Sequence, residues 1–203
     1  MNPLFQHPFV LNMQYIFLFG LLAASIVLFI LKRKNSPYLL SALPLFALTF
    51  HQVDEYLLSP LVLGDDYHFL NWAYRSGVNI TPNAVVAVNL FGYLGALAVY
   101  CFKPSTKLFA LIFLFVNSVT LANACFHIGL ATAQSDYSPG MISALFLFLP
   151  LYIKSITLAM EGMCSFREMF GISLYGFIAH YILIWIINVC LLYTSPSPRD
   201  NKA

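Results

Sequence analysis

Phe50-His51-Gln52-Val53-Asp54-Glu55-Tyr56 closes an otherwise apolar segment that begins near Tyr38. On a helix, residues three and four positions apart share a face, so we expect His51 to lie beside Asp54 and Glu55. Ionisable groups near the end of a membrane span are costly, because inserting one charged side chain into hydrocarbon costs roughly 2.5–3.5 kcal/mol on an insertion scale. This cost favours a functional role. The alternative is that the two acidic residues mark where the helix reaches water and that His51 is a buried hydrogen-bonding group.

The composition indicates a membrane protein. Of the 203 residues 60% are hydrophobic and 9% are charged, and the mean hydropathy is +0.79, which lies outside the range of soluble domains. The formal charge is only +2 and the basic residues are dispersed, which argues against nucleic acid as a partner. The four cysteines lack CxxC or zinc-ribbon spacing, so no disulfide framework is expected. We therefore expect an all-α, polytopic membrane helix bundle, with membrane lipids as its surroundings and protein partners unknown.

Six apolar segments are long enough to cross a hydrocarbon layer of about 30 Å. The expected spans are approximately 14–31, 38–58, 82–102, 108–131, 139–160 and 170–189. Prolines near the breaks support this division, because proline lacks an N–H donor and starts or stops helices. Residues 1–13 carry neither the basic region nor the cleavage site of a signal peptide, so the first span is expected to stay as an anchor. We thus expect residues 1–189 to form one transmembrane domain.

The basic residues predict the orientation of these spans. In a six-span arrangement nearly all lysines and arginines of the short loops fall on one side: Lys32, Arg33, Lys34, Lys103, Lys107 and Arg167. Only Arg75 falls on the other side. Because positively charged loops stay in the cytoplasm, we expect the N-terminus outside, in a bacterial inner (plasma) membrane.

The outer loop at residues 61–81 mixes aromatic and charged residues. Its aromatics and its leucine are Tyr67, Phe69, Leu70, Trp72 and Tyr74, set among Asp65, Asp66, His68 and Arg75. Amphipathic aromatic rings favour the headgroup level of a bilayer. We therefore expect an interfacial helix or lid over the outer ends of the spans.

The C-terminal segment resembles a translated sequencing adapter. CLLYTSPSPRD at residues 190–200 is similar to the in-frame translation of a transposon-end sequencing adapter. We interpret residues 190–203 as a non-native tail, with a genuine polar tail as the alternative. The natural C-terminus beyond about residue 189 is then unknown.

A second polar stripe lies on the expected fourth span. Asn117, Thr120, Asn123 and His127 follow one another at steps of three, three and four, within an arc of about 120° on one helix face. His127 and His51 both fall roughly 6–10 Å below the outer membrane surface at 1.5 Å per residue. Asn89 on the third span falls at a similar depth, so Asn89 and Asn123 are expected to line the same site. For Asn89, an ordinary helix–helix hydrogen bond is the alternative.

These motifs together resemble a known family. His51-Gln52-Val53-Asp54-Glu55, the later His127, and Tyr137-Ser138-Pro139-Gly140 are similar to the HXXEE domain family, whose members carry an HxxEE motif, a further histidine and a YxPG motif. The resemblance covers about residues 45–150. It departs at Asp54, where the family usually has glutamate. The family has no established activity, so the resemblance implies that the three motifs belong together without naming a reaction.

Two further residues have both a structural and a functional interpretation. Tyr137 can anchor at the interface beside a helix-starting proline, or its hydroxyl can lie over the histidine pair as a proton donor. His180 lies midway along the last expected span, deeper than the outer site. A buried, hydrogen-bonded histidine is the expected role for His180.

The preferred function is a metal-dependent membrane hydrolase acting on a lipid-like substrate. Two imidazoles and a carboxylate, from His51, Glu55 and His127, suit zinc or non-haem iron, and their donor atoms would then approach within about 3–4.5 Å of each other. Glu55, Asp54 and Tyr137 are the candidate catalytic residues. Three alternatives remain: a metal-free acid–base lipid isomerase or cyclase, a proton or cation transporter or sensor, and a structural or partner-binding protein.

Overall fold

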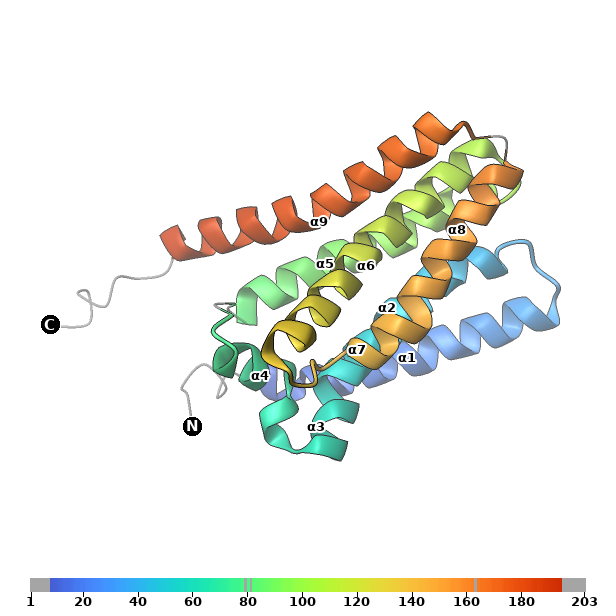
Figure 1. The fold of residues 1–203 in the computed structure, drawn as a ribbon. Helices are drawn as coiled ribbons and strands as arrows, with labels where there is room; N and C mark the ends of the chain where they lie inside the picture. Colours follow the sequence, from blue (N-terminus) through green and yellow to red (C-terminus); the bar gives the residue numbers. More distant parts are fainter. Residues whose placement is uncertain (1–7, 79, 81, 163, 195–203) are drawn as a thin grey trace, which may run out of the picture.

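The computed structural model describes residues 8–78, 80, 82–162 and 164–194, and every regular element in this part of the chain is helical. The long helices are α1 (Pro8–Arg33), α2 (Leu39–Val53), α5 (Pro82–Ala98), α6 (Lys107–Gln134), α8 (Leu149–Glu161) and α9 (Phe166–Thr194). They run alternately up and down along a common direction (Figure 1). The expected all-α bundle is confirmed.

Short elements connect or extend the long helices. They are the π-helix η2 (Asp54–Leu58), α3 (Ser59–Leu63), the 3₁₀ turn η3 (Asp65–Tyr67), α4 (Phe69–Arg75), the 3₁₀ turn η4 (Val99–Cys101), α7 (Met141–Ser143) and the π-helix η5 (Ala144–Phe148). The expected break at Ser59-Pro60 does not end a helix, because proline at the first turn of α3 loses no bond that the turn needs. The last helix runs to Thr194, past the expected end at residue 189. Residues 195–203 of the expected non-native tail lie outside the described part.

Five described helices are long and apolar enough to cross a membrane: Asn12–Arg33, Ala84–Cys101, Lys107–Gln134, Met141–Glu161 and Phe166–Ile186. The chain is thus a multi-pass membrane protein. The expected span 38–58 is missing from this set because its polar cluster lowers the hydropathy. It nevertheless continues as unbroken helical turns over residues 39–63, roughly 37 Å at 1.5 Å per residue, which exceeds the hydrocarbon thickness. The six-span count remains a prediction.

Helix α2 forms the centre of the bundle, whereas α1 faces outward. Nine residues of α2 are buried, including His51 and Gln52. Helix α1 packs on α2 and leaves apolar side chains such as Phe19 (70% exposed) on the surface that would face lipid. The two helices approach closely at Gly20, where an added Cβ would lie 2.9 Å from Thr49 Cγ2. A small residue permits this contact, as is usual between membrane helices.

Helices α6 and α9 make the other close contact. A Cβ at Gly176 would lie 2.7 Å from both the Phe115 carbonyl oxygen and Ser118 Cβ. This approach holds the first half of α9 against α6, which also packs on α8. The result is that α2, α5, α6 and α9 surround a common interior.

The loop after α3 folds back onto the bundle. Tyr74 is exposed, but Phe69, Leu70 and Trp72 are buried in one apolar cluster with Tyr56. The expected lid is therefore packed into the core through one face of α4. The same loop is hydrogen-bonded to the connection after α6. There, Asp136 accepts hydrogen bonds from the Tyr67 hydroxyl at 2.8 Å and from Arg75 Nη2 at 3.2 Å.

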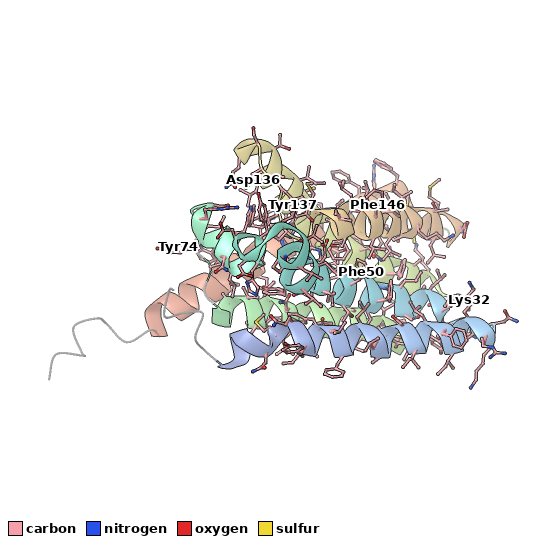
Figure 2. The ribbon with its side chains drawn as sticks, turned by 90° about the horizontal axis from the view of Figure 1, so that it is seen from below. Lys32, Phe50, Tyr74, Asp136, Tyr137 and Phe146 are labelled. Carbon is pink, nitrogen blue, oxygen red and sulfur yellow. The ribbon has the colours of Figure 1, made fainter. Side chains whose placement is uncertain are left out.

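The two ends of the bundle differ in charge. Lys32 lies at the far end from Tyr74, Asp136 and Tyr137 (Figure 2). The antiparallel arrangement places the other loop lysines and arginines, apart from Arg75, at the Lys32 end. Positive charge at one end is the arrangement that orients membrane proteins with that end in the cytoplasm.

This asymmetry leads to a topology prediction. In a chain whose own cysteines are replaced, Asn35→Cys should not react with an impermeant thiol reagent in intact cells, whereas Asp66→Cys at the opposite end should react. Both positions are exposed in the structure, so accessibility of the thiol is matched. Labelling of Asn35→Cys alone in intact cells would mean that the predicted orientation is reversed.

Candidate metal centre

The transition from α2 to η2 places the acidic residues of the first motif inside the bundle. A π-helical turn accommodates one extra residue and is frequent at functional sites. His51 is 1%, Asp54 3% and Glu55 4% exposed, although all three carry ionisable groups. The acidic pair therefore does not mark the place where the helix reaches water.

Three side chains converge at this point. Glu55 Oε1 lies 3.4 Å from His51 Nε2 and 3.1 Å from His127 Nε2. The imidazole rings of His51 and His127 lie 4.9 Å apart, edge to face. All three donor atoms lie within 4.8 Å of one another. The structure thus brings His51, Glu55 and His127 together from α2, η2 and α6.

The geometry is compatible with a bound metal ion. His51 Nε2 and His127 Nε2 are both buried, and apart from their contacts with Glu55 Oε1 neither has a hydrogen-bond partner among the described residues. Such groups are costly to leave unpaired. Two ligand atoms about 2.1 Å from a tetrahedral zinc lie roughly 3.4 Å apart, close to the two distances to Glu55. The three residues therefore form a group that could hold a divalent ion.

The other nitrogen of His51 is held by a serine. His51 Nδ1 lies 2.8 Å from Ser143 Oγ. The single Ser143 hydroxyl hydrogen is shared between two acceptors, Asp54 Oδ2 at 2.8 Å and the Gly140 carbonyl at 2.8 Å. Since that hydrogen points away from the ring, His51 Nδ1–H must donate to Ser143 Oγ. The tautomer leaves the lone pair on Nε2, as a metal ligand requires.

His127 has a matching partner. Its Nδ1 lies 2.9 Å from Ser138 Oγ, and both side chains are fully buried. Ser138 and Ser143 stand on either side of Gly140 in one short segment. The same stretch of chain therefore orients both imidazoles.

Gly140 sits directly against the cluster. Its φ is +88°, and an added Cβ would lie 2.6 Å from His51 Cε1 and 2.8 Å from Glu55 Cγ. Glycine is required here for two independent reasons, the backbone conformation and the close approach. The expected helix-start role of the Tyr137-Ser138-Pro139-Gly140 segment is thus joined by a role in shaping the site.

Asp54 and Tyr137 lie beside the cluster. Asp54 Oδ2 accepts hydrogen bonds from the Ser143 hydroxyl and backbone N–H, and Asp54 Oδ1 accepts one from Ser59 Oγ at 3.3 Å. The Tyr137 hydroxyl lies 3.4 Å from Ser59 Oγ, and burial raises the pKa of Tyr137, so the hydroxyl stays protonated at neutral pH. Asp54 therefore acts on His51 through Ser143, and Tyr137 contacts Ser59, whereas no hydrogen bond in the described part joins it to either histidine.

Asn89 and Asn123 line a cavity next to the cluster. A cavity of about 300 Å³ reaches His51, Gln52, Asn89, Asn123 and His180, and a smaller one of about 90 Å³ reaches Glu55. Asn89 donates a hydrogen bond to Gln52 Oε1 at 2.9 Å, as its structural interpretation predicted. His180 differs from the expectation, because its Nε2 is buried and lacks a hydrogen-bond partner among the described residues.

Sequence reasoning did not identify Ser138 and Ser143. Serine is common in membrane helices and its spacing carries no metal signal, so neither residue stood out. The available signal was positional: Ser138 is the variable residue of the YxPG-like motif, and Ser143 follows Gly140 by three positions. A serine one turn beyond a glycine that opens a helix lies over the same face.

Comparison with protein families assigns the chain to one family. The family model described as "Protein of unknown function with HXXEE motif" matches residues 41–155, more than half of the chain. The chain therefore belongs to this family, and the match contains all three converging residues and both serines. Comparison with curated proteins and with solved structures gives no match.

The close approach at Gly140 yields a paired test. Gly140→Ala should lower the thermal unfolding midpoint more than Gly77→Ala. Both glycines have positive φ, +88° and +72°, so both substitutions carry the left-handed cost of about 1–2 kcal/mol. Only Gly140→Ala adds an overlap with His51 and Glu55, since nothing lies within 4 Å of a Cβ at Gly77. An equal decrease of the unfolding midpoint for both variants, measured in detergent-solubilised protein, would contradict the close contact of Gly140 with His51 and Glu55.

The serines yield a second prediction. Ser143→Ala and Ser138→Ala should each weaken zinc binding by about 10–100-fold, the usual effect of removing a group that orients a histidine ligand. Isothermal titration of purified protein with zinc measures this. Ser118→Ala is the control, because Ser118 is equally buried and its hydroxyl bonds only the Leu114 carbonyl in its own helix. Zinc affinity unchanged in all three variants would show that Ser138 and Ser143 do not orient the histidine ligands.

Proposed function

We propose that this member of the HXXEE family is an intramembrane metal-dependent hydrolase that acts on a lipid-like substrate near the outer membrane face. The observation that carries the proposal is the convergence of three buried donor atoms, two of which lack hydrogen bonds. We further propose that the protein lies in a bacterial inner membrane with its N-terminus outside.

The donor set favours zinc or iron. Two neutral imidazoles and one carboxylate are the ligands of catalytic zinc sites and of non-haem iron sites, where an open position remains for water or substrate. Glu55 supports this assignment because a buried carboxylate needs a positive partner. Glu168, the partner of the Lys107 amine at 2.7 Å, shows the ordinary solution at the opposite end of the bundle. No lysine or arginine stands in that position at Glu55 in the described part of the chain.

Each residue of the cluster then has a specific task. His51, Glu55 and His127 hold the ion, Ser143 and Ser138 fix the two rings, and Asp54 positions Ser143. A bound divalent ion would supply Lewis-acid chemistry and lower the pKa of water. Burial of the cluster excludes bulk water, so that only a molecule entering through the adjoining cavities can reach it.

The substrate class follows from the surroundings. The cavity beside His51 is bounded mainly by apolar side chains of α2, α5, α6 and α9, within the part of the bundle that lies in hydrocarbon. A polar solute would leave its hydrogen bonds unmade there. A lipid-like molecule is the substrate that this interior accepts.

One observation favours a second candidate, a metal-free acid–base enzyme. Asp54, Ser143, His51, Glu55 and His127 form an unbroken series of polar contacts between 2.8 and 3.4 Å. Such a series can move a proton between the carboxylates and the imidazoles, as in an isomerase or cyclase. The two candidates differ in whether the purified protein contains metal.

Elemental analysis of detergent-purified protein therefore tests the proposal. We expect about one zinc or iron per chain, and a loss of at least about tenfold in affinity for His51→Ala, Glu55→Gln and His127→Ala, since each removes one of three ligands. His68→Ala is the control, because His68 packs edge to face on Tyr56 outside the cluster. Each variant should first elute as a monodisperse species, so that unfolding is not mistaken for loss of metal.

The outcomes separate the candidates. Metal in the parent and in His68→Ala, with loss in the three ligand variants, supports the metal centre. Substoichiometric metal that does not change among well-folded variants refutes it and favours the acid–base candidate. Metal that persists in His51→Ala and His127→Ala places the ion elsewhere in the protein.

A further inference from the structure

We propose that the cavity beside the metal centre is a slot for a single uncharged acyl or alkyl chain, whose polar oxygen group is bound by His180 and Asn123. This inference deepens the proposed function, on which its enzymatic meaning rests, by naming the substrate class. The binding itself requires no metal and is tested separately below.

Two polar side chains at the cavity lack partners. His180 is 4% exposed and its Nε2 makes no hydrogen bond with a described residue. Asn123 Oδ1 is also buried and without a partner. The residues come from α9 and α6, and both border the larger and the smaller cavity. Unpaired buried groups on two helices that face one space indicate a ligand that pairs with both.

The two unpaired atoms, His180 Nε2 and Asn123 Oδ1, indicate which polar group a ligand would carry. A neutral imidazole nitrogen can donate or accept, and an amide oxygen accepts. A hydroxyl group satisfies both residues at once, because it accepts a bond from the imidazole and donates one to the amide oxygen. The nearby Asn89 and Gln52 already use one group each in their mutual hydrogen bond, Asn89 Nδ2 and Gln52 Oε1, so these two groups do not compete for the ligand hydroxyl.

The charge of the site excludes ionic headgroups. No lysine or arginine is among the described residues that border the two cavities, and Glu55 is acidic. In the metal-free protein, a phosphate or carboxylate placed beside His180 and Asn123 would be buried without a counter-charge from the described residues, which is strongly unfavourable. The occupant is therefore an uncharged amphiphile rather than a phospholipid headgroup or a fatty acid.

The cavity extends away from the polar residues along the bundle. Pro44 lies seven positions before His51 on α2, and Val116 lies seven before Asn123 on α6, so both are roughly 10 Å closer to the Lys32 end. The lining there is apolar or small. At about 30 Å³ for each non-hydrogen atom, 300 Å³ holds roughly ten atoms, which is one medium-length chain and not two.

The cavity also approaches the lipid-facing surface. Phe91 borders the cavity and is itself 53% exposed. At Phe91, on α5, the wall of the cavity therefore continues into the surface that would contact lipid. A chain can enter sideways from the bilayer at this point.

Gly95 provides a specific test. It borders the cavity, and nothing lies within 4 Å of a Cβ built on it. Gly95→Leu therefore adds a side chain at the cavity wall, and its Cβ meets no other atom of the protein within 4 Å. Gly171→Leu is the matched control, because Gly171 on α9 also has nothing within 4 Å of its Cβ and does not border the cavity in the described part.

The experiment uses decan-1-ol with a diazirine at the chain end as a photoreactive probe, on protein in nanodiscs. Mass spectrometry of the labelled peptides should place the adducts on α5 and α6 at the apolar end of the cavity. Gly95→Leu should reduce labelling by about tenfold or more and Gly171→Leu should not, because only the former occupies the slot. In chelator-treated protein, decan-1-ol should compete at least about tenfold better than decanoate, whose charge no described residue of the cavity can pair.

The polar residues are tested in the same assay. His180→Phe and Asn123→Leu should each weaken competition by decan-1-ol, whereas decane, which has no hydroxyl, should compete equally in the parent and in these two variants. Labels elsewhere on the protein, labelling insensitive to Gly95→Leu, or equal competition by decanoate would overturn the inference. Treatment with a chelator separates the binding slot from the metal centre. Labelling that survives metal removal supports the slot. A protein that retains metal but is not labelled supports the metal centre and refutes the slot.

Discussion

The structure depends on how a buried carboxylate is paired inside a membrane bundle. Glu55 is 4% exposed, and its Oε1 faces two imidazole nitrogens that have no hydrogen bonds of their own. A carboxylate removed from water costs several kcal/mol unless it gains a partner of opposite charge or strong hydrogen bonds. A divalent ion between the three residues meets this requirement, and so does a proton shared within the cluster. Either solution requires the three side chains to stay close together, so the elements around Glu55 must hold both imidazoles in place.

Two segments far apart in the chain form the two halves of the site. Residues 51–55 carry two of the converging side chains on α2 and η2, and residues 138–143 hold the rings in place from the other side. Each half contains or adjoins a π-helical turn, η2 in the first and η5 in the second. A π-turn widens the helix by one residue and redirects the side chains that follow. The close contact of Gly140 with His51 and Glu55 joins the halves, so that neither could move without the other.

Much of the candidate site was predictable from the sequence, because helical spacing and span length are local properties. The step of four between His51 and Glu55 places them on one face, and the position of His127 along its span places it at a similar depth. These two quantities were sufficient to predict that the three residues meet. The sequence leaves the role of Asp54 open, because its spacing from His51 also suits a ligand, and only the structure places its carboxylate on Ser59 and Ser143. His180 was interpreted as a hydrogen-bonded buried residue because a sequence carries no information about which buried groups find partners.

The sequence by itself determined the helical class, the membrane environment, the charge asymmetry of the two ends and the convergence of His51, Glu55 and His127. Each of these follows from composition or from a fixed rise and rotation per residue. Only the tertiary structure decided which serine meets which histidine, that α4 is packed into the core, and that a cavity with unpaired His180 and Asn123 opens beside the cluster. Those features depend on the rotation and separation of neighbouring helices, which are set by contacts such as Gly20 with Thr49 and Gly176 with Phe115. Side chains distant in sequence become neighbours only through such contacts, so no local pattern encodes them.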